Sequence, residues 1–162
     1  MRERIALVAG LLVLAAIDYV IVQRESLVAN GKVVLLELAP VDPRSLMQGD
    51  YMALRFRLAT EAFGSGRDMK DGRIVVALDE RGVGKFKRLD DGTPLASDET
   101  LVRYRVRNGE PKLATNAFFF QEGQGGIYQA ARYGEFRASA DGEVILTAMR
   151  GANLEVLGPR QP

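Results

Sequence analysis

Three residue types that carry much of protein chemistry are missing from this chain. Its 162 residues include no cysteine, no histidine and no tryptophan. Without cysteine the chain forms no disulfide, binds no metal through thiolates and has no thiol to acylate as a lipoprotein. Without histidine it lacks the commonest general base and the commonest metal ligand. We therefore expect no metal site, no cofactor and no catalytic residue, and any catalysis would depend on serine, lysine, tyrosine or carboxylates.

An excess of charge of either sign is also missing. The chain has 22 Lys and Arg residues against 21 Asp and Glu residues, a formal net charge of +1. Nucleic-acid binding usually requires a marked basic excess. We therefore expect no nucleic-acid partner, and we find no internal repeat or low-complexity segment that would indicate a repeat or fibrous protein.

One long apolar run begins close to the N-terminus. Residues 5–22 read IALVAGLLVLAAIDYVIV, with Asp18 as the only charge. As a helix this run is about 27 Å long, close to the bilayer core of about 30 Å. Arg2 and Arg4 precede it, which favours a cytoplasmic N-terminus. The run predicts a single-pass anchor in the inner (cytoplasmic) membrane, with the rest of the chain outside, in the periplasm.

A cleaved signal peptide is the alternative interpretation of this run. Val13-Leu14-Ala15 has the small residues of a cleavage site after a short apolar core. However, the hydrophobicity continues to Val22, so we expect an uncleaved anchor.

The remaining sequence suits one modest domain of roughly 135 residues. We divide the chain into an anchor at 1–22, a helical exit or linker at 23–31, a β domain at 32–158 and a tail at 159–162. Apolar and alternating runs predict strands at 32–39, 51–58, 73–79, 83–89, 100–107, 112–120, 135–140 and 143–149. Residues 127–133 predict one or two helical turns. The fold class is therefore mainly β, an antiparallel domain that is barrel-like or built of two sheets.

Two strands show a clear period of two, and two dipeptides indicate hairpins. In 51–58 the alternation places Met52, Leu54, Phe56 and Leu58 inward. In 100–107 it places Val102, Tyr104 and Val106 inward, with Leu101, Arg103, Arg105 and Arg107 outward. Asn108-Gly109 and Asp141-Gly142 are strong hairpin signals, so each is expected to join two antiparallel strands.

The most distinctive stretch is a cluster of turn-forming residues ahead of the strand at 51–58. It reads Asp42-Pro43-Arg44-Ser45-Leu46-Met47-Gln48-Gly49-Asp50-Tyr51. Pro43 fixes φ and Asp42 can bond to its own backbone, which starts a turn. Gly49 supplies a conformation that other residues resist. This structural interpretation stands beside a second one, in which Asp50 and Tyr51 form a ligand or partner site.

Residues 35–56 closely resemble the GDYXXLXY family of bacterial membrane-anchored proteins. The naming motif falls on Gly49, Asp50, Tyr51, Leu54 and Phe56, where Phe replaces the last Tyr. The resemblance extends to QRESLVANG at 23–31 and to FFFQEGQG at 118–125. It implies one anchor, an extracytoplasmic domain and no established activity. Members of the family often resemble companions of multi-spanning membrane proteins.

A weaker resemblance is to signal peptidases, whose β-fold carries a Ser–Lys dyad. Pro43, Leu46, Gly49 and Asp50 match the first part of their pattern, and 71–76 with 86–88 resemble the later parts. The nucleophile position is occupied by Pro40. Ser45 lies on the other side of Pro43, and would need to reach a lysine such as Lys87 with a lowered pKa. The resemblance implies a shared β architecture more than an activity.

Three charged positions are candidates for partner binding. Arg103 and Arg105 can contact an anion, a lipid headgroup or an acidic partner, or can simply keep a strand face solvated. Asp18 can reach the interface beside Tyr19, or can face a polar group on a neighbouring transmembrane helix.

The loop at 121–126 contains three glycines, but no Gly-Lys-Ser/Thr follows it, so it does not predict a phosphate loop. We interpret the chain as a non-catalytic accessory or interaction subunit that works with the membrane and a multi-spanning inner-membrane protein. The alternatives are a signal-peptidase-like hydrolase and a lipid- or small-ligand-binding β domain.

Overall fold

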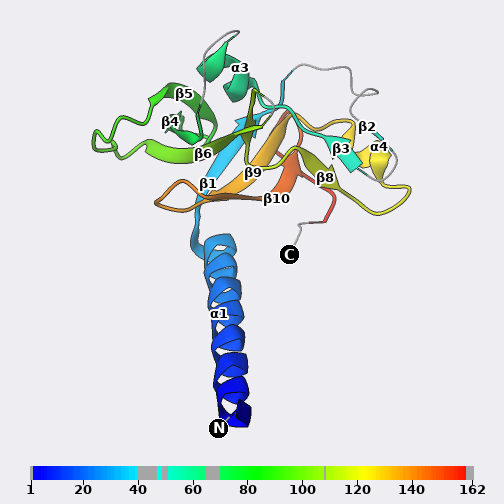
Figure 1. Ribbon diagram of the computed structural model, residues 1–162. Helices are drawn as coiled ribbons and strands as arrows, with labels where there is room; N and C mark the ends of the chain where they lie inside the picture. The colour runs from blue at the N-terminus through cyan, green and yellow to red at the C-terminus, as the bar shows by residue number, and fades with distance from the viewer. Residues whose placement is uncertain (1, 40–46, 49–50, 65–69, 108, 160–162) are drawn as a thin grey trace.

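The computed structural model describes residues 2–39, 47–48, 51–64, 70–107 and 109–159. A single long helix, α1 (Arg2–Asn30), projects from a β-rich domain, with the N-terminus at its far end (Figure 1). Two short helices, α3 (Arg57–Phe63) and α4 (Gly125–Tyr128), belong to the domain. The chain is thus mainly β after one long N-terminal helix, as the sequence predicts.

Helix α1 stands free of the domain over most of its length. Its 29 residues give a length of about 43 Å. The apolar part is long enough to cross a membrane, and none of it is buried inside the chain. The helix runs without a break through residues 23–30, the expected exit segment, and ends where Gly31 N–H donates to the Leu27 carbonyl at 2.9 Å. The exit from the apolar run is therefore helical.

Three antiparallel sheets make up the domain. Their orders are β1-β9-β10-β11, β2-β3-β8 and β5-β4-β6-β7. The strands are β1 (Lys32–Glu37), β2 (Met47–Gln48), β3 (Tyr51–Ala53), β4 (Gly72–Leu78), β5 (Gly84–Leu89), β6 (Glu99–Arg107), β7 (Glu110–Leu113), β8 (Ala117–Phe119), β9 (Tyr133–Ala138), β10 (Val144–Arg150) and β11 (Val156–Leu157).

The two four-stranded sheets curl toward each other as half-barrels. Leu35 in β1 forms a parallel bridge with Val83, and its N–H donates to the Gly82 carbonyl at 2.9 Å. On the other side, Arg103 N–H donates to the Gly142 carbonyl at 2.8 Å. The shared core contains fully buried side chains from both sheets, including Val34, Leu36, Ile74, Val76, Val102, Phe136 and Met149. The barrel-like antiparallel architecture predicted from the sequence is confirmed.

The prediction of one strand over residues 51–58 is wrong for the second half of that segment. Strand β3 ends at Ala53 and α3 begins at Arg57. The predicted inward set is nevertheless buried, with Met52, Leu54, Phe56 and Leu58 at most 5% exposed. The backbone stays extended to Phe56, because Leu54 N–H and the Arg55 carbonyl find partners in Asn116 and Ala39. Beyond that point Leu58, Ala62 and Phe63 form the buried face of a helix.

The expected strand at 112–120 is in fact two strands in different sheets. Residues 110–113 pair with β6, as the hairpin signal at 108–109 predicts, and Gly109 has a φ of 76°. Ala114 then has a φ of 53°, which interrupts the extended backbone. Strand β8 pairs instead with β3. The paired residues lie 64 to 68 positions apart in the chain, so local pattern gives no sign of this pairing.

Three smaller expectations are corrected or confirmed. Leu101, expected to point outward, is only 9% exposed because the β9–β10 hairpin covers it: a Cβ on Gly142 would lie 3.0 Å from the Leu101 Cβ. The expected helical turns at 127–133 begin at Gly125 and end at Tyr128, and Tyr133 already belongs to β9. The hairpin at Asp141-Gly142 forms between β9 and β10, as predicted.

Candidate functional site

The described part of the family motif lies in the small sheet β2-β3-β8. Asp42, Pro43, Arg44, Ser45, Gly49 and Asp50 lie outside the described residues. Tyr51 opens β3, is half-buried, and lies opposite Phe119 of β8 with ring centroids 5.7 Å apart. The motif strand and the FFFQEGQG segment, separate in sequence, are therefore hydrogen-bonded neighbours. The sequence showed both elements but not their pairing.

The later motif positions, Leu54 and Phe56, belong to the hydrophobic core. Leu54 is 5% exposed and Phe56 is 4% exposed. The Phe56 ring meets Phe136 edge-on at 5.4 Å. A tyrosine hydroxyl buried here would need a hydrogen-bond partner. The phenylalanine in this chain removes that requirement, and both positions have a structural role.

The three consecutive phenylalanines at 118–120 differ in environment. Phe118 is 2% exposed and packs against Tyr128 at 4.8 Å, while Phe120 stacks on the same Tyr128 at 5.2 Å. Burial raises the pKa of the Tyr128 hydroxyl. Phe119 is 65% exposed on the opposite face. The alternation of β8 thus puts one ring in the core and leaves the next on the surface beside Tyr51.

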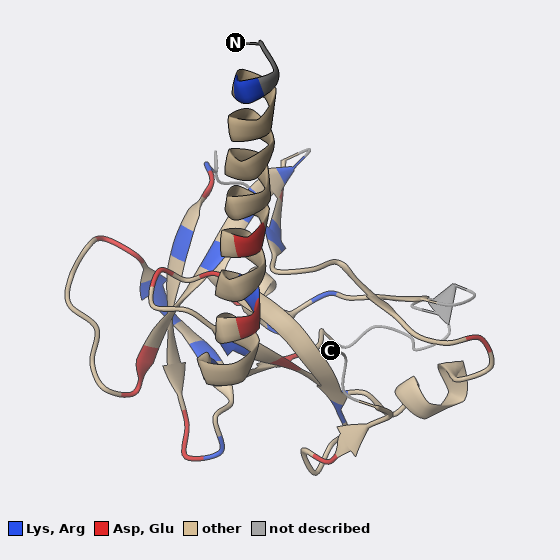
Figure 2. Cartoon of the chain, turned by 90° about the horizontal axis from the view of Figure 1, so that it is seen from below, with Lys and Arg blue, Asp and Glu red and all other residues tan. Residues whose placement is uncertain are grey.

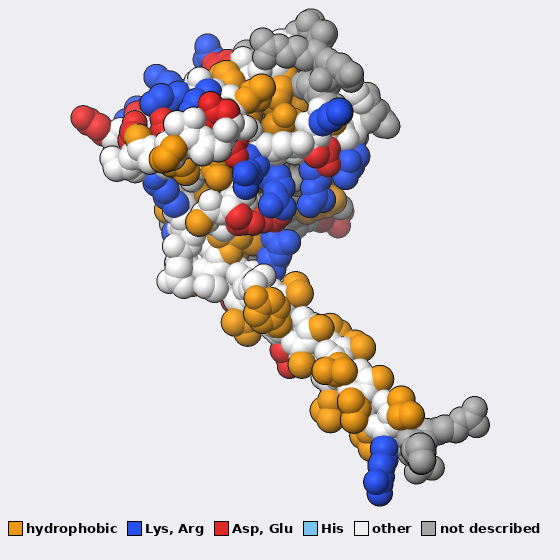
Figure 3. All heavy atoms as spheres, turned by 60° about the vertical axis from the view of Figure 1, so that its left-hand side comes forward, with side chains coloured by type: hydrophobic (Ala, Val, Ile, Leu, Met, Phe, Trp, Pro, Cys, Tyr) orange, Lys and Arg blue, Asp and Glu red, His pale blue; other side chains and the backbone are white. Residues whose placement is uncertain are grey.

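The outward-facing arginines predicted on β6 are Arg103, Arg105 and Arg107, and two of them, Arg103 and Arg107, lie beside carboxylates. Arg103 lies directly opposite Arg73, and Arg105 lies opposite Lys112. Like charges in such cross-strand positions repel. Arg103 is held by Glu143 at 2.6 Å and Asp141 at 3.4 Å, and Arg73 is held by Asp90 at 2.8 Å. Figure 3 shows side chains of both signs interspersed on this side of the domain.

Arg105 differs from its neighbours because it is exposed and forms no hydrogen bond or ion pair with any described residue. It borders a hollow of about 480 Å³ together with Arg73, Arg103 and Arg107. Of the two predicted arginines, Arg105 is therefore the one whose guanidinium donors are available to a partner, whereas those of Arg103 hold the β9–β10 hairpin.

Lys87, the base in the hydrolase alternative, is paired with a carboxylate. Its Nζ lies 2.6 Å from Glu99 Oε1, and Glu99 has only 5% of its side chain exposed. The hydrogen bond to Glu99 and its charge raise the pKa of Lys87. A Ser–Lys dyad needs the opposite shift, because only the neutral amine accepts a proton. Ser45, the proposed nucleophile of the dyad, lies outside the described residues.

Asp18 lies exposed on the free part of α1, away from the domain. Close by, the Tyr19 hydroxyl accepts a hydrogen bond from Gln23 Nε2 at 2.7 Å, one helical turn later. Figure 2 shows the chain from below, with α1 in front of the domain. Lys and Arg positions are distributed over the strands, whereas the helix carries few charged positions. Asp18 is consequently the one charged residue in the apolar part of α1, residues 5–22.

The junction between α1 and the domain is built from specific contacts. Glu143 accepts hydrogen bonds from Arg24 at 3.3 Å and from Arg103 at 2.6 Å, so one carboxylate links the helix, the hairpin and β6. A Cβ on Gly31 would lie 2.5 Å from the Leu27 carbonyl and 2.9 Å from the Arg137 Cβ. Only glycine fits this close approach between the end of α1 and β9. Sequence reasoning did not identify this junction.

Metal chemistry finds no support among the residues placed by the structure. They contain no group of three or more His, Cys, Asp or Glu side chains that could hold an ion. The polar side chains of the described core also find partners, since none of their buried nitrogen or oxygen atoms lacks a hydrogen bond. No described site therefore has the unsatisfied donors or acceptors that would point to a missing ligand inside the domain.

The fold and these sites define a class of protein: a β-rich half-barrel domain carried on one long apolar helix. The sequence model described as GDYXXLXY protein matches residues 13–149, which is most of the chain. The chain belongs to the GDYXXLXY protein family. No curated protein matches the sequence. The search of solved structures also gave no match.

Proposed function

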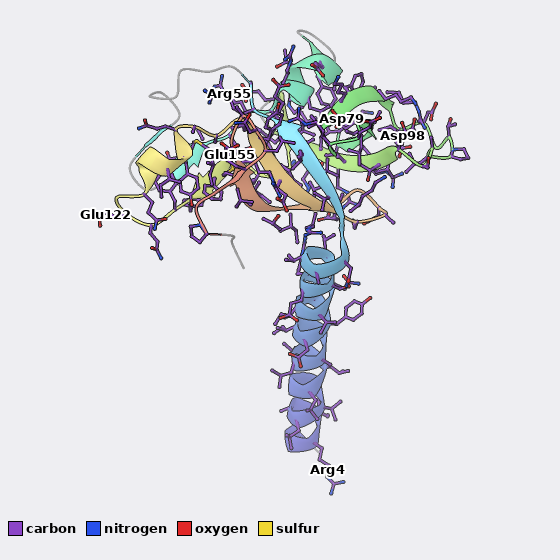
Figure 4. All side chains as sticks on the ribbon, turned by 180° about the vertical axis from the view of Figure 1, so that it is seen from behind. Arg4, Arg55, Asp79, Asp98, Glu122 and Glu155 are labelled. Carbon is purple, nitrogen blue, oxygen red and sulfur yellow. The ribbon has the colours of Figure 1, made fainter. Side chains whose placement is uncertain are left out.

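We propose that this chain is an anchored interaction subunit of a membrane assembly, with α1 spanning the inner membrane and the β domain in the periplasm. The proposal rests on α1, whose apolar length suffices to cross a bilayer and whose side chains the chain itself leaves uncovered. Arg2 and Arg4 at its start favour a cytoplasmic N-terminus. Figure 4 shows Arg4 at the end of α1 farthest from the domain.

The partner we propose is a multi-spanning membrane protein that packs against α1 around Asp18. A carboxylate costs about 2.5–3.5 kcal/mol at the centre of a span, and less near the surface. Asp18 lies only four residues from the outer end of the apolar run, so it does not force a partner but offers one a polar contact. Leu11, Leu14 and Val22 share its face at helical spacing.

A second contact of this proposal lies on the domain, at Arg105. The surrounding arginines and the hollow beside them suit an acidic surface of the partner. Because Arg105 is exposed, its attraction is screened by salt. The interaction is therefore expected to weaken as ionic strength rises.

A co-purification experiment tests the proposal. Full-length wild type and the Asp18→Leu and Arg105→Ala variants are solubilised in a mild detergent, and the recovered membrane proteins are compared. We expect Asp18→Leu to insert normally and to recover less of a multi-spanning protein. Arg105→Ala should reduce recovery chiefly at low salt, and its difference from wild type should shrink as salt screens the contact. The controls are Ile21→Leu on α1 and Arg81→Ala on an exposed turn. If both variants recover the same proteins in the same amounts as wild type, the proposed function is wrong.

A further inference from the structure

The outer end of α1 and the β9–β10 hairpin line an open hollow, a groove of about 1180 Å³. One wall is the helix from Tyr19 upward, and the other includes Ser139, Asp141 and Glu143 of the hairpin. Figure 1 shows the β9–β10 hairpin extending sideways next to the top of α1, the two elements whose residues line the hollow. The hollow is therefore lined by apolar residues of α1 at one end and by polar residues of the domain at the other.

The hollow lies at the level of the lipid headgroups if α1 spans a bilayer. Its lowest lining residues, Tyr19, Val20 and Val22, belong to the apolar run. Eight residues separate Val22 from Asn30, about 12 Å along the helix. The headgroup layer adds about 5–7 Å on each side of the hydrocarbon core. The lower part of the hollow therefore opens to acyl chains and the upper part opens to headgroups.

The polar end of the hollow carries charges of both signs. Arg24 is 56% exposed and touches Glu143 at 3.3 Å, which leaves several of its five N–H donors available. Lys32 Nζ donates to the carbonyls of Ser97 and Glu99, at 3.2 and 3.0 Å. Cationic and anionic groups thus lie within one groove, a few ångströms apart at Arg24 and Glu143.

The hairpin supplies the exposed anion. The Asp141 side chain is 60% exposed. The Ser139 hydroxyl donates a hydrogen bond to it and thereby lowers its pKa, so the carboxylate stays ionised at neutral pH. Arg103 also contacts Asp141 at 3.4 Å and Glu143 at 2.6 Å, and Glu143 is less exposed, so Asp141 is the carboxylate with surface left for a ligand. A headgroup with a phosphate and a primary ammonium complements both signs.

We propose that this groove binds one aminophospholipid of the outer leaflet, with its phosphate at Arg24, its ammonium at Asp141, and an acyl chain along Tyr19, Val20 and Val22. A choline headgroup fits less well, because its quaternary ammonium has no N–H to donate. The inference requires α1 to lie in a bilayer but does not require a protein partner. It is therefore independent of the contacts proposed at Asp18 and Arg105.

Native mass spectrometry of the full-length chain in a lipid-retaining detergent tests this inference. Phosphatidylethanolamine, phosphatidylcholine and phosphatidylglycerol with identical acyl chains are added in turn. We expect one phosphatidylethanolamine to bind per chain, with affinity at least about tenfold above that of the other two. Equal binding of the three lipids would overturn the inference.

Two tryptophan variants locate the binding. Ser26 lines the groove, whereas Glu25, the preceding residue, points to the other side of α1 and does not line it. Ser26→Trp should fill the groove and lower phosphatidylethanolamine affinity at least about tenfold, and Glu25→Trp should leave it unchanged. Equal loss in both variants, or in neither, would contradict the inference.

A charge variant tests the headgroup assignment. Asp141→Asn should bring the affinities for phosphatidylethanolamine and phosphatidylcholine closer together, and thermal unfolding checks that the variant is folded at the temperature of the binding experiment. If Ser26→Trp keeps its lipid but no longer recovers a membrane protein in the co-purification, the groove binds protein and the lipid proposal is wrong. If Asp18→Leu no longer recovers the partner protein but still binds the lipid, the result supports both the protein contact at Asp18 and a separate lipid site in the groove.

Discussion

Lys87 of β5 and Glu99 of β6, the two strands that flank β4, form a short ion pair with 2.6 Å between Nζ and Oε1. The hydrogen bond from Lys87 and the backbone N–H of Ala96 lower the pKa of Glu99. The same pair raises the pKa of Lys87. Each group thus stabilises the charged form of the other, and the lysine is held as an ammonium at neutral pH.

The first prediction follows for catalysis. Because Lys87 is held charged, the chain should not react with serine- or lysine-directed hydrolase probes. Incubation of the full-length protein with a fluorophosphonate, followed by mass spectrometry, should show no adduct, and Lys87→Ala should give the same result. Labelling of Ser45 that disappears in Lys87→Ala would restore the hydrolase alternative.

The second prediction concerns the pH dependence of stability. Glu99 has a folded pKa below its usual 4.5, so its stabilising contribution is present above about pH 4.5 and is lost as pH falls through the folded pKa. Lys87→Gln should therefore lower the unfolding temperature at about pH 7, and the difference from wild type should shrink toward about pH 3. Lys85→Gln, on the same strand, is the matched control and should show a smaller difference at neutral pH. A difference that is constant over this range would contradict the assignment.

The third prediction separates two neighbouring rings of β8. Phe118 is buried against Tyr128, and Phe119 lies on the surface against Tyr51. Phe118→Ala should reduce the free energy of unfolding by about 3–5 kcal/mol, through lost burial and a cavity. Phe119→Ala should cost about 1 kcal/mol or less, the size of one aromatic pair. Chemical denaturation of both variants measures the contrast, and similar losses would mean that the register of β8 is wrong.

The fourth prediction concerns a buried ion pair in the β9–β10 sheet. Glu135 has 2% of its side chain exposed and accepts hydrogen bonds from Arg150 Nε at 2.6 Å and Nη2 at 2.5 Å. Arg150→Met would remove this cation and its two hydrogen bonds from a buried carboxylate and should cost about 3–5 kcal/mol. The double variant Glu135→Leu/Arg150→Met should recover much of that loss. Arg132→Met, at an exposed position, is the control. If the double variant is as unstable as the single one, the loss comes from packing and not from removal of the ion pair.

The sequence by itself determined the features that depend on nearby residues. The apolar run predicted α1, the period of two predicted which side chains of 51–58 are buried, and the two hairpin dipeptides predicted the turns after β6 and β9. It also determined the family, through a motif that is contiguous in the chain. These features follow from local backbone geometry and side-chain spacing, which the order of residues contains directly.

Only the tertiary structure decided which distant segments meet. It paired β8 with β3, it covered Leu101 with the β9–β10 hairpin, and it placed Glu143 between Arg24 and Arg103. It also turned the chain into α3 at Arg57, where a strand was expected. Such choices depend on the free energy of contacts between residues far apart in the chain. Periodicity does not encode those contacts, because the same alternation of apolar residues suits many partners.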